Sequence, residues 1–247
     1  MSRFRLGLVL AALAVVVLLI SAPARLLALV VPSQQLVLQG YEGTLWRGSA
    51  ARCLIKVGHG YVHLGRIDWQ LSASSLLTLS PRLTLASEWG RQQFSGEITL
   101  HNSTTVDIKN AEGRAQAQLL RQFMPLLIGG EFTGQVQQLR VKDGQPYAGT
   151  GRLVWENASW LAYGGARTLG SYALDFEQSE GQPLIGEVVT IAGPLNVAGN
   201  LRLEGRNYTV DVLLEQSDAL DEQLQQALSL VAQPVASGYR VELQGQF

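Results

Sequence analysis

The amino-acid sequence predicts a mainly β protein. An N-terminal transmembrane helix is expected first, followed by an elongated, twisted antiparallel β-sheet domain arranged as a meander, with one or two amphipathic helices packed on it. Two arginines precede an unbroken apolar run at the start of the chain, and beyond Pro32 apolar and polar residues alternate with period two. The 26 glycines fall largely between or at the edges of the alternating segments. Period two gives a strand one wetted and one buried face, which is typical of antiparallel sheet.

The N-terminal segment predicts the compartment. Arg3 and Arg5 precede an apolar stretch that continues to Ala24, which supplies the length of about 20 residues that a membrane-spanning helix needs. We therefore expect a short cytoplasmic segment at residues 1–5, a transmembrane anchor at 6–24 and an exported β-rich domain at 32–247. The two arginines stay on the cytoplasmic side under the positive-inside rule.

A cleaved secretory signal is the alternative interpretation. Such a signal also has a basic start, an apolar centre and a small-residue end, and Ala22-Pro23-Ala24 fits that end. The chain stays apolar beyond this point, in "RLLALVVP", where a mature secreted domain more often turns polar. We therefore favour an uncleaved anchor, and in both interpretations the residues after about 32 are exported.

Alternating segments recur along the exported part and are expected to be strands. They are Arg82–Ser87, Phe94–Leu100, Gln135–Val141, Tyr172–Glu177, Leu201–Gly205, Tyr208–Glu215 and Tyr239–Gly245. "KDGQ" and "EGRN" have the composition of hairpin turns, because glycine readily adopts the positive φ that such turns require. The sequence contains no polar linker that would divide this part, so it predicts one meandering domain.

Two segments have helical periodicity instead. Between Arg114 and Phe123, three apolar residues form a short stripe that stops before Pro125. A stronger pattern follows Ser217 and Asp218, either of which can cap the first turn, and it ends before Pro234. Its apolar positions are Leu220, Leu224, Ala227, Leu228 and Val231. We interpret it as an amphipathic helix that packs on the sheet.

Composition excludes several classes of protein. The formal net charge is -1, and Lys and Arg are scattered singly, so nucleic acid is not an expected partner. The single cysteine, Cys53, cannot form an intramolecular disulfide. It lies in a β-like segment with Lys56 on the opposite face, and we expect an apolar filler rather than a reactive thiol.

No strong motif indicates catalysis, a cofactor or a metal. The sequence lacks a Gly-x-Ser-x-Gly elbow and the glycine-rich phosphate loops. His59 and His63 have H-x-x-x-H spacing, but in a strand residues four apart stand about 13 Å apart, too far for one metal ion. Carboxylates within the alternating segments are expected to face solvent; they are Asp68, Glu97, Asp175 and Asp211. We therefore expect no enzyme, no cofactor and no metal.

"GYEGTLWRGSA", Gly40 to Ala50, is interpreted as packing rather than as a ligand loop. In a strand from Thr44 to Ala50, Trp46, Gly48 and Ala50 share one face. The two small residues leave space in which the indole ring can lie along the sheet. The segment thus predicts a packing device in the first strand.

Four short motifs, three of them with a tryptophan, follow one another along the chain: "GTLWRGSA" with Trp46, Gly48 and Ala50, "IDWQLSASSLL" with Trp69, "GTGRLVWENAS" with Trp155 and Asn157, and "LGSYALDF". Their order resembles that of the type II secretion system protein N family, also called general secretion pathway protein N. Each motif is short, but their order and spacing behind a basic-flanked anchor extend over nearly the whole chain. The six motif residues are expected to be structural.

The resemblance implies a single-pass inner-membrane protein of a Gram-negative bacterium with its bulk in the periplasm. It implies a non-enzymatic accessory subunit of the machine that exports folded proteins across the outer membrane. The expected partners are the inner-membrane platform and the secretin. Docking is expected at an edge strand near Tyr239–Phe247, where unpaired backbone groups can add a partner's strand.

A second function follows from a wider likeness to AsmA-like proteins, whose periplasmic sheets resemble grooves that carry lipid between membranes. Such a groove needs an apolar face that stays uncovered. The helix predicted between Leu220 and Val231 would cover that face if it packed there. The sequence leaves lipid binding open as the alternative function and an exported hydrolase as a remote third.

Overall fold

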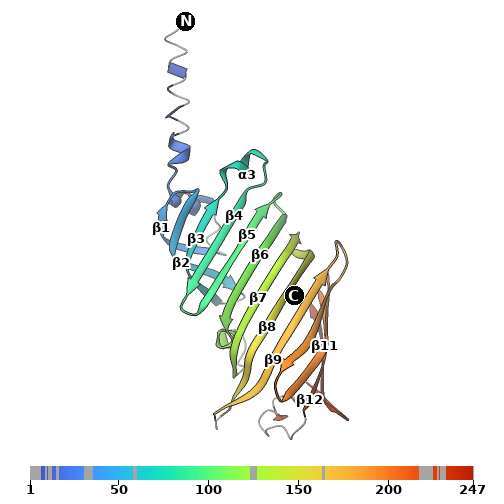
Figure 1. The fold of residues 1–247 in the computed structure, drawn as a ribbon. Helices are drawn as coiled ribbons and strands as arrows, with labels where there is room; N and C mark the ends of the chain where they lie inside the picture. The colour runs from blue at the N-terminus through green and yellow to red at the C-terminus, as the bar shows by residue number, and fades with distance from the viewer. Residues whose placement is uncertain are drawn as a thin grey trace. The chain divides into compact units, whose positions relative to one another are not determined.

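The protein is described by a computed structural model, which gives residues 7–246 except 9, 11–12, 15–16, 31–35, 58–59, 123–126, 163–164, 217–224, 227 and 229–231. The chain divides into two compact units, Met1–Gly90 and Arg91–Phe247. Both units are built mainly of antiparallel strands (Figure 1). The prediction of a mainly β, antiparallel protein is therefore confirmed. The expected boundaries of the exported domain, 32–247, stay a prediction.

The first unit is a four-stranded meander, in which each strand pairs with the next in the order β1-β2-β3-β4. Its elements are η1 (Ala24–Leu26), α2 (Leu27–Val30), β1 (Leu36–Gly43), β2 (Arg47–Val57), β3 (Gly60–Leu71), α3 (Ala73–Leu77) and β4 (Arg82–Trp89). The two short N-terminal helices contact β1 and β2 through a small buried core, described below. The unit thus contains part of the segment that the sequence assigned to the anchor.

The second unit is a longer meander, in which strands pair in the order β5-β6-β7-β8-β9-β10-β11-β12-β14-β13. Its first elements are β5 (Gln92–Leu100), β6 (Thr105–Gln116), η2 (Ala117–Gln122), β7 (Ile128–Lys142), β8 (Gln145–Ala162) and β9 (Gly165–Gln178). They are followed by β10 (Leu184–Ala192), β11 (Leu195–Glu204), β12 (Asn207–Gln216), β13 (Gln233–Val235) and β14 (Gly238–Gln246). Only the last two strands depart from sequential order, because β14 pairs with β12 and β13 pairs with β14.

The alternating segments correspond closely to observed strands. All seven predicted segments lie within strands, apart from the terminal Gly205. Both hairpins are confirmed: Asp143 and Gly144 join β7 to β8, and Gly205 lies in the turn between β11 and β12. Asp143, Gly144 and Gly205 have φ of 53°, 76° and 61°, the left-handed conformation that such turns require. The local turn chemistry therefore agrees with the fold.

The two helical predictions are confirmed only in part or fall mostly outside the described residues. Arg114–Gln116 continues strand β6, and only Ala117–Gln122 is helical, as the 3₁₀ element η2. The extension of β6 is physically reasonable, because Arg114, Ala115 and Gln116 all pair with β7. Phe123 and most of the predicted 217–231 helix lie outside the described residues; of that stretch the structure describes Gln225, Gln226 and Leu228, which are helical.

The predicted anchor at 6–24 is described only in part. The described residues between Gly7 and Ile20 are helical, and Ser21–Ala24 leads into η1. Among the residues that the structure describes, no helix reaches the length and apolarity that a membrane crossing requires. Membrane spanning therefore stays a prediction.

One face of the second unit is apolar and the other polar. In β11, Val197 and Leu201 are less exposed than Asn196 and Arg202, which lie on the opposite face. The register aligns the apolar positions of neighbouring strands, as where Leu201 lies opposite Val210. We define the apolar face by its larger side chains, which include Phe94, Ile98, Leu100, Ile108, Val136, Leu139, Leu153, Trp155, Tyr172, Leu174, Phe176, Val188, Val197, Leu201, Leu203, Val210, Val212, Leu214, Val241 and Leu243.

Candidate interaction surfaces

Trp69 is the centre of the buried core in the first unit. It is 5% exposed and packs with Ala24 and Ala50, which are 1% and 0% exposed. Partly buried apolar side chains surround these three residues, namely Leu27, Leu38, Tyr41, Ile67, Leu83 and Leu85. The indole N–H of Trp69 donates a hydrogen bond of 3.2 Å to the backbone oxygen of Leu45. The ring is thus both packed and hydrogen-bonded, as buried indoles usually are.

The structure corrects the predicted position of Trp46. Strand β2 begins at Arg47, and Trp46 lies in the bend that follows the Thr44 bridge, so it does not share a strand face with Gly48. The space above Gly48 is filled by Trp69, its partner across β2 and β3; a Cβ at position 48 would lie 2.7 Å from Cζ2 of that ring. The packing device exists, but a neighbouring strand supplies the indole, because strand register and not sequence proximity decides which ring meets the glycine.

Trp46 connects the N-terminal segment to the sheet. Its indole N–H donates a hydrogen bond of 2.7 Å to the backbone oxygen of Leu19. The neighbouring backbone N–H of Leu45 donates to Ala22 at 2.8 Å, and Pro23 forms a β-bridge with Thr44. The end of the apolar segment is therefore held against the β1–β2 turn by backbone and side-chain contacts.

Trp155 and Asn157 lie at a bulge in β8. The indole N–H of Trp155 donates to the oxygen of Gly129 at 3.1 Å, and its ring stacks on Phe132 with a centroid separation of 5.4 Å. Asn157 has φ of 50°, in the left-handed region that asparagine tolerates better than most residues. The register shifts between Trp155 and Ala158, and Ala158 is fully buried. These contacts are packing and backbone contacts. Arg3 and Arg5 lie outside the described residues.

Strand β14 forms a partly open sheet edge. It pairs with β12 along its whole length, and β13 covers its other side only at Gly238–Arg240. Within the described part of the chain, no strand pairs with the outer side of Val241–Gln246. Phe247 lies outside the described residues. The edge expected near the C-terminus is thus present over six residues, and it offers unpaired backbone groups to an added strand.

The apolar face of the second unit is incompletely covered by described residues. Four of its large side chains remain accessible: Phe94 is 37% exposed, Leu153 40%, Leu100 44% and Leu243 45%. They come from three well-separated strands of the meander, β5, β8 and β14. Small residues lie between the large ones; for example, a Cβ at Gly151 would lie 2.5 Å from the ring of Phe176. This face can accept apolar ligands or apolar protein surface.

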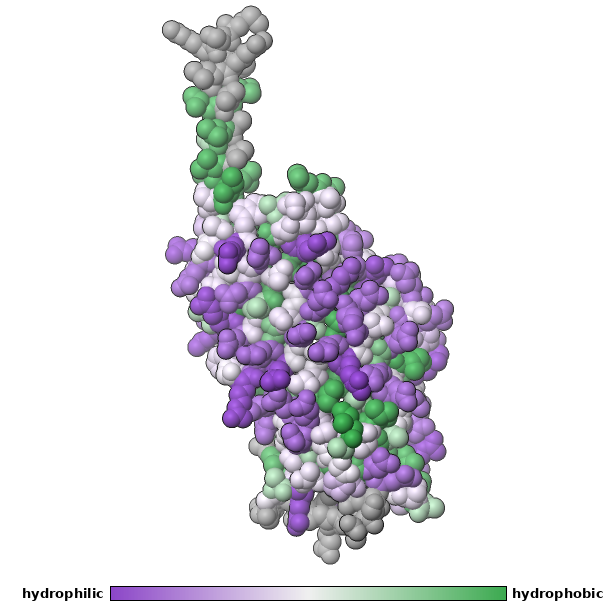
Figure 2. Space-filling model, in the orientation of Figure 1, coloured by the Kyte–Doolittle hydropathy of each residue, from purple (hydrophilic) through white to green (hydrophobic). Residues whose placement is uncertain are grey.

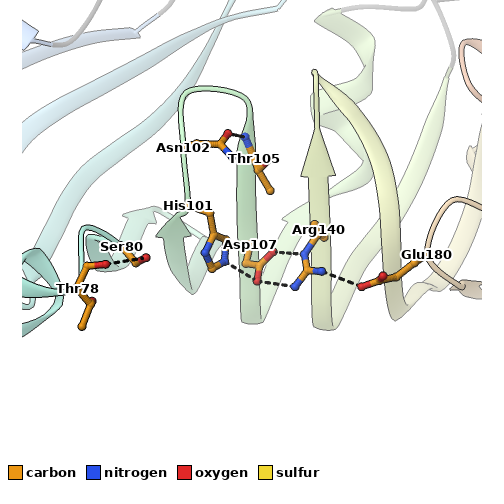
Figure 3. Close-up of polar contacts among 8 residues, drawn as sticks. All are labelled: Thr78, Ser80, His101, Asn102, Thr105, Asp107, Arg140 and Glu180. Carbon is orange, nitrogen blue, oxygen red and sulfur yellow. Dashed lines mark hydrogen bonds and ion pairs between the residues drawn. The ribbon is translucent and has the colours of Figure 1, made fainter.

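A cluster of charged side chains lies on the opposite, polar face (Figure 3). Asp107, which is 7% exposed, accepts hydrogen bonds from Arg140 at 2.7 and 3.2 Å, and its Oδ2 lies 2.9 Å from Nε2 of His101. Arg140 also donates to Glu180 at 2.8 Å. The hydrogen bond from Arg140 lowers the pKa of Asp107 to about 2, against the opposing effect of burial. A concavity of about 340 Å³ lies beside these residues.

Other strand carboxylates are paired with arginines in the same way. Asp175 lies opposite Arg152 in the register, and their charged groups are 3.2 Å apart. Asp211 accepts hydrogen bonds from Arg240 at 2.7 and 2.8 Å, which lowers the pKa of its carboxyl. As expected, these carboxylates lie on an accessible face. Their cross-strand pairing is typical of sheet stabilisation rather than of acid–base catalysis.

The cysteine and the histidine pair considered in the sequence are either packed against other side chains or lie outside the described residues. Cys53 is fully buried in β2, and burial raises the pKa of its thiol, as expected of an apolar filler. The ring of His63 packs at a tilt against that of Trp89, with ring centroids 4.8 Å apart. His59 lies outside the described residues, and among those described no three His, Cys, Asp or Glu side chains converge as metal ligands.

The charged cluster was missed by sequence reasoning. Asp107 and Arg140 are 33 residues apart and become neighbours only through the pairing of β6 with β7. An aspartate and an arginine in two alternating strands give no signal of their own. Their pairing depends on the register of β6 against β7, which runs without a shift from Thr105 opposite Lys142 to Gln116 opposite Glu131.

Comparisons with known proteins agree on one family. The family model for type II secretion system (T2SS), protein N matches residues 34–242. A protein of Vibrio cholerae named type II secretion system protein N is 31% identical over 228 residues, which cover 85% of each chain. A protein of the same name from Aeromonas hydrophila is 26% identical over 238 residues, covering 90% of this chain and 89% of the relative. No solved structure matches.

Proposed function

Because the chain belongs to the type II secretion system protein N family, we propose that it is a non-enzymatic accessory subunit of the type II secretion system, attached to the inner membrane. It supports export of folded proteins through protein–protein contacts in the periplasm. The observation that carries this proposal is the family match, which extends from 34 to 242 and thus includes strands of both units. The expected partners are the inner-membrane platform and the secretin.

The N-terminal contacts support attachment through an uncleaved anchor. Seven large apolar side chains of the helical N-terminal segment are 55–70% exposed, which is costly in water and favourable in lipid; they are Leu8, Leu10, Leu13, Val17, Leu18, Leu19 and Ile20. Cleavage after Ala24 would remove Ala24 from the core around Trp69 and break the bond from Trp46 to Leu19. Retention of the segment therefore preserves contacts of the folded unit.

The open edge of β14 is the docking surface that we assign to the partner. An added strand would pair with the backbone of Val241–Gln246, and the alternating side chains of the edge would select the partner. Gln244 is exposed and lies within this edge, which makes it a suitable position for a photo-crosslinking residue. Asn200 in the interior strand β11 is exposed as well and serves as the matched control position.

The experiment is cross-linking in native membranes, followed by purification and mass spectrometry. A crosslinker at position 244 should recover a platform or secretin component, whereas the same crosslinker at position 200 should recover much less. Recovery of neither component, by either this crosslinker or a general amine crosslinker, would count strongly against the proposed function. Equal recovery from both positions would reject the edge as the docking surface while leaving the function in place.

Lipid binding is the second candidate function, and the accessible apolar face of the second unit favours it. Phospholipid with a photoactivatable group in its acyl chain should label this face in the full-length protein reconstituted in membranes. Leu153→Asn, on the apolar face, should lower the labelling, whereas Ile185→Asn should not, because the 45% exposed Ile185 lies opposite Arg202 on the polar face. Labelling confined to the N-terminal segment would reject lipid carriage by the sheet.

A further inference from the structure

The loop between β3 and β4 exposes large apolar side chains at its tip. We name it the α3 loop and define it as Ser72–Pro81. Leu77 is 88% exposed and Leu79 is 83% exposed, and Leu76 is accessible at 38%. The segment contains no Asp, Glu, Lys or Arg, and the first charged residue after it is Arg82. Single exposed leucines are ordinary on protein surfaces. Two almost fully exposed leucines in one loop without charged residues indicate an apolar partner.

The backbone of the loop is strained where it presents a leucine. Leu79 has φ of 53°, a left-handed conformation that is rare for residues other than Gly, Asn and Asp. In this conformation the side chain reaches solvent rather than the core. Strained backbone at an exposed apolar residue is a marker of function, because neither stability nor solubility favours it.

The hydroxyls of the loop are hydrogen-bonded to one another and to nearby backbone groups. The hydroxyl of Ser75 donates to the oxygen of Ser72 at 2.5 Å and accepts the backbone N–H of Arg82 at 2.8 Å. The hydroxyl of Thr78 donates to the backbone oxygen of Ser75 at 2.9 Å. The hydroxyl of Ser80 donates to the backbone oxygen of Thr78 at 3.4 Å, as Figure 3 shows. Leaving water therefore costs this loop little, since its hydroxyls already have partners.

Hydrogen bonds place the α3 loop at the same end of the first unit as the apolar N-terminal segment. Trp46 donates through its indole to Leu19, at the end of that segment. The backbone oxygen of the same Trp46 accepts the N–H of Leu71 at 2.7 Å, and Leu71 directly precedes the loop. In Figure 1 the α3 loop lies at the same end of the first unit as the C-terminal end of the N-terminal segment, and Figure 2 shows hydrophobic residues at both places.

We propose that the α3 loop inserts Leu77 and Leu79 into the periplasmic interface of the bilayer that holds the N-terminal anchor. This inference rests on the anchor of the proposed function. A helix that crosses the membrane brings this end of the unit to the lipid headgroups, where exposed leucines gain an apolar environment and Arg82 can reach phosphates.

The test uses the full-length protein in nanodiscs, with an environment-sensitive fluorophore on single introduced cysteines. Leu77→Cys reports the loop, Leu18→Cys reports the anchor, and Tyr61→Cys is the matched exposed control. Tyr61 is 48% exposed and ten residues before Leu71 in β3, about 33 Å along the strand. The native Cys53 is fully buried, so the unsubstituted chain measures the labelling background. Circular dichroism checks that each variant is folded.

Fluorophores at positions 77 and 18 should emit at shorter wavelength and lose intensity when the discs contain nitroxide-labelled lipids, and the one at position 61 should do neither. If the fluorophore at position 77 shows the emission of an aqueous environment while the one at position 18 is quenched by the labelled lipids, the inference is overturned and the proposal of an anchor is retained. An aqueous fluorophore at 18 rejects the anchor itself. Shielding at 77 that appears in native membranes but not in nanodiscs assigns the leucines to a protein partner and also overturns the inference.

Discussion

Replacement of Trp69 by alanine tests the packing at the centre of the first unit. The side chain is 5% exposed and contacts the buried Ala24 and Ala50. Truncation of a buried tryptophan to alanine costs about 3–5 kcal/mol, and the loss of the hydrogen bond to the oxygen of Leu45 moves the expected value toward the upper end. Trp69→Ala should therefore be among the most destabilising single substitutions in this unit.

Trp46→Ala is the matched control, because the same residue type is removed from a half-buried position. It loses the 2.7 Å hydrogen bond to Leu19 and part of its packing, for which we expect about 1–2 kcal/mol. Urea unfolding of the full-length protein in detergent, followed by far-ultraviolet circular dichroism, compares the two variants. For a urea dependence of about 1–3 kcal/mol per M, Trp69→Ala should lower the midpoint by about 1 M or more.

Hydrogen exchange read peptide by peptide assigns the effect to the correct region. Trp69→Ala should accelerate exchange in β1, β2 and β3, with β8 and β9 of the second unit as the internal reference. A loss below about 1 kcal/mol for Trp69→Ala, or an equal loss for the two variants, would refute the assignment of the packing role to Trp69.

Three further substitutions test other parts of the structure. Asp107→Asn should remove the part of the acid dependence of stability that the pair with Arg140 creates. The pKa of Asp107 is lowered to about 2, so the ionised carboxylate adds about 2 kcal/mol to the free energy of unfolding above pH 4, and this contribution is lost as the pH falls toward 2. Urea unfolding measured between pH 2 and pH 5 tests this. Gly151→Ala should lower the free energy of unfolding by about 1–3 kcal/mol, because the new Cβ would lie 2.5 Å from the ring of Phe176. A lower midpoint of urea unfolding would show this. Leu79→Asn should raise the free energy of unfolding by up to about 1 kcal/mol in detergent, because asparagine relieves the left-handed strain, measured in the same way.

Each of these predictions has an outcome that contradicts it. An unchanged acid profile in Asp107→Asn would show that the ion pair contributes nothing to folding. Gly151→Ala combined with Phe176→Leu should cost less than the sum of the two single substitutions, and simple additivity would argue against the contact. Destabilisation by Leu79→Asn would mean that the leucine side chain packs on the unit and is not merely held out from it.

Local patterns were enough to predict most strands, both hairpins and the division of each strand into an apolar and a polar side. Alternation in Leu201–Gly205 and Tyr208–Glu215 is a property of consecutive residues, and so is the turn chemistry of "EGRN" between them. The interpretation of Cys53 as a buried filler rested on the same kind of local information. Family membership also followed from motif order, without any knowledge of the contacts that the motifs make.

Predictions that depended on contacts across strands were less successful. Trp46 was expected above Gly48 because the two are close in sequence, whereas Trp69 occupies that space through the register of β2 and β3. The segment from Arg114 to Gln116 was expected in a helix, but pairing with β7 keeps it in a strand. Helical spacing of apolar residues over only one or two turns stabilises a helix less than a complete set of interstrand hydrogen bonds stabilises a strand.

The sequence by itself determined the class of the protein: its mainly β character, its alternating faces, its apolar N-terminal run and its family. Period and composition are local quantities, so a single chain expresses them directly. Only the tertiary structure decided that Asp107 meets Arg140 and that Trp69 covers Gly48. It also decided that the leucines of the α3 loop lie at the end of the unit where the apolar segment ends. These contacts depend on strand register, and a shift of one residue sends every side chain of a strand to the other face.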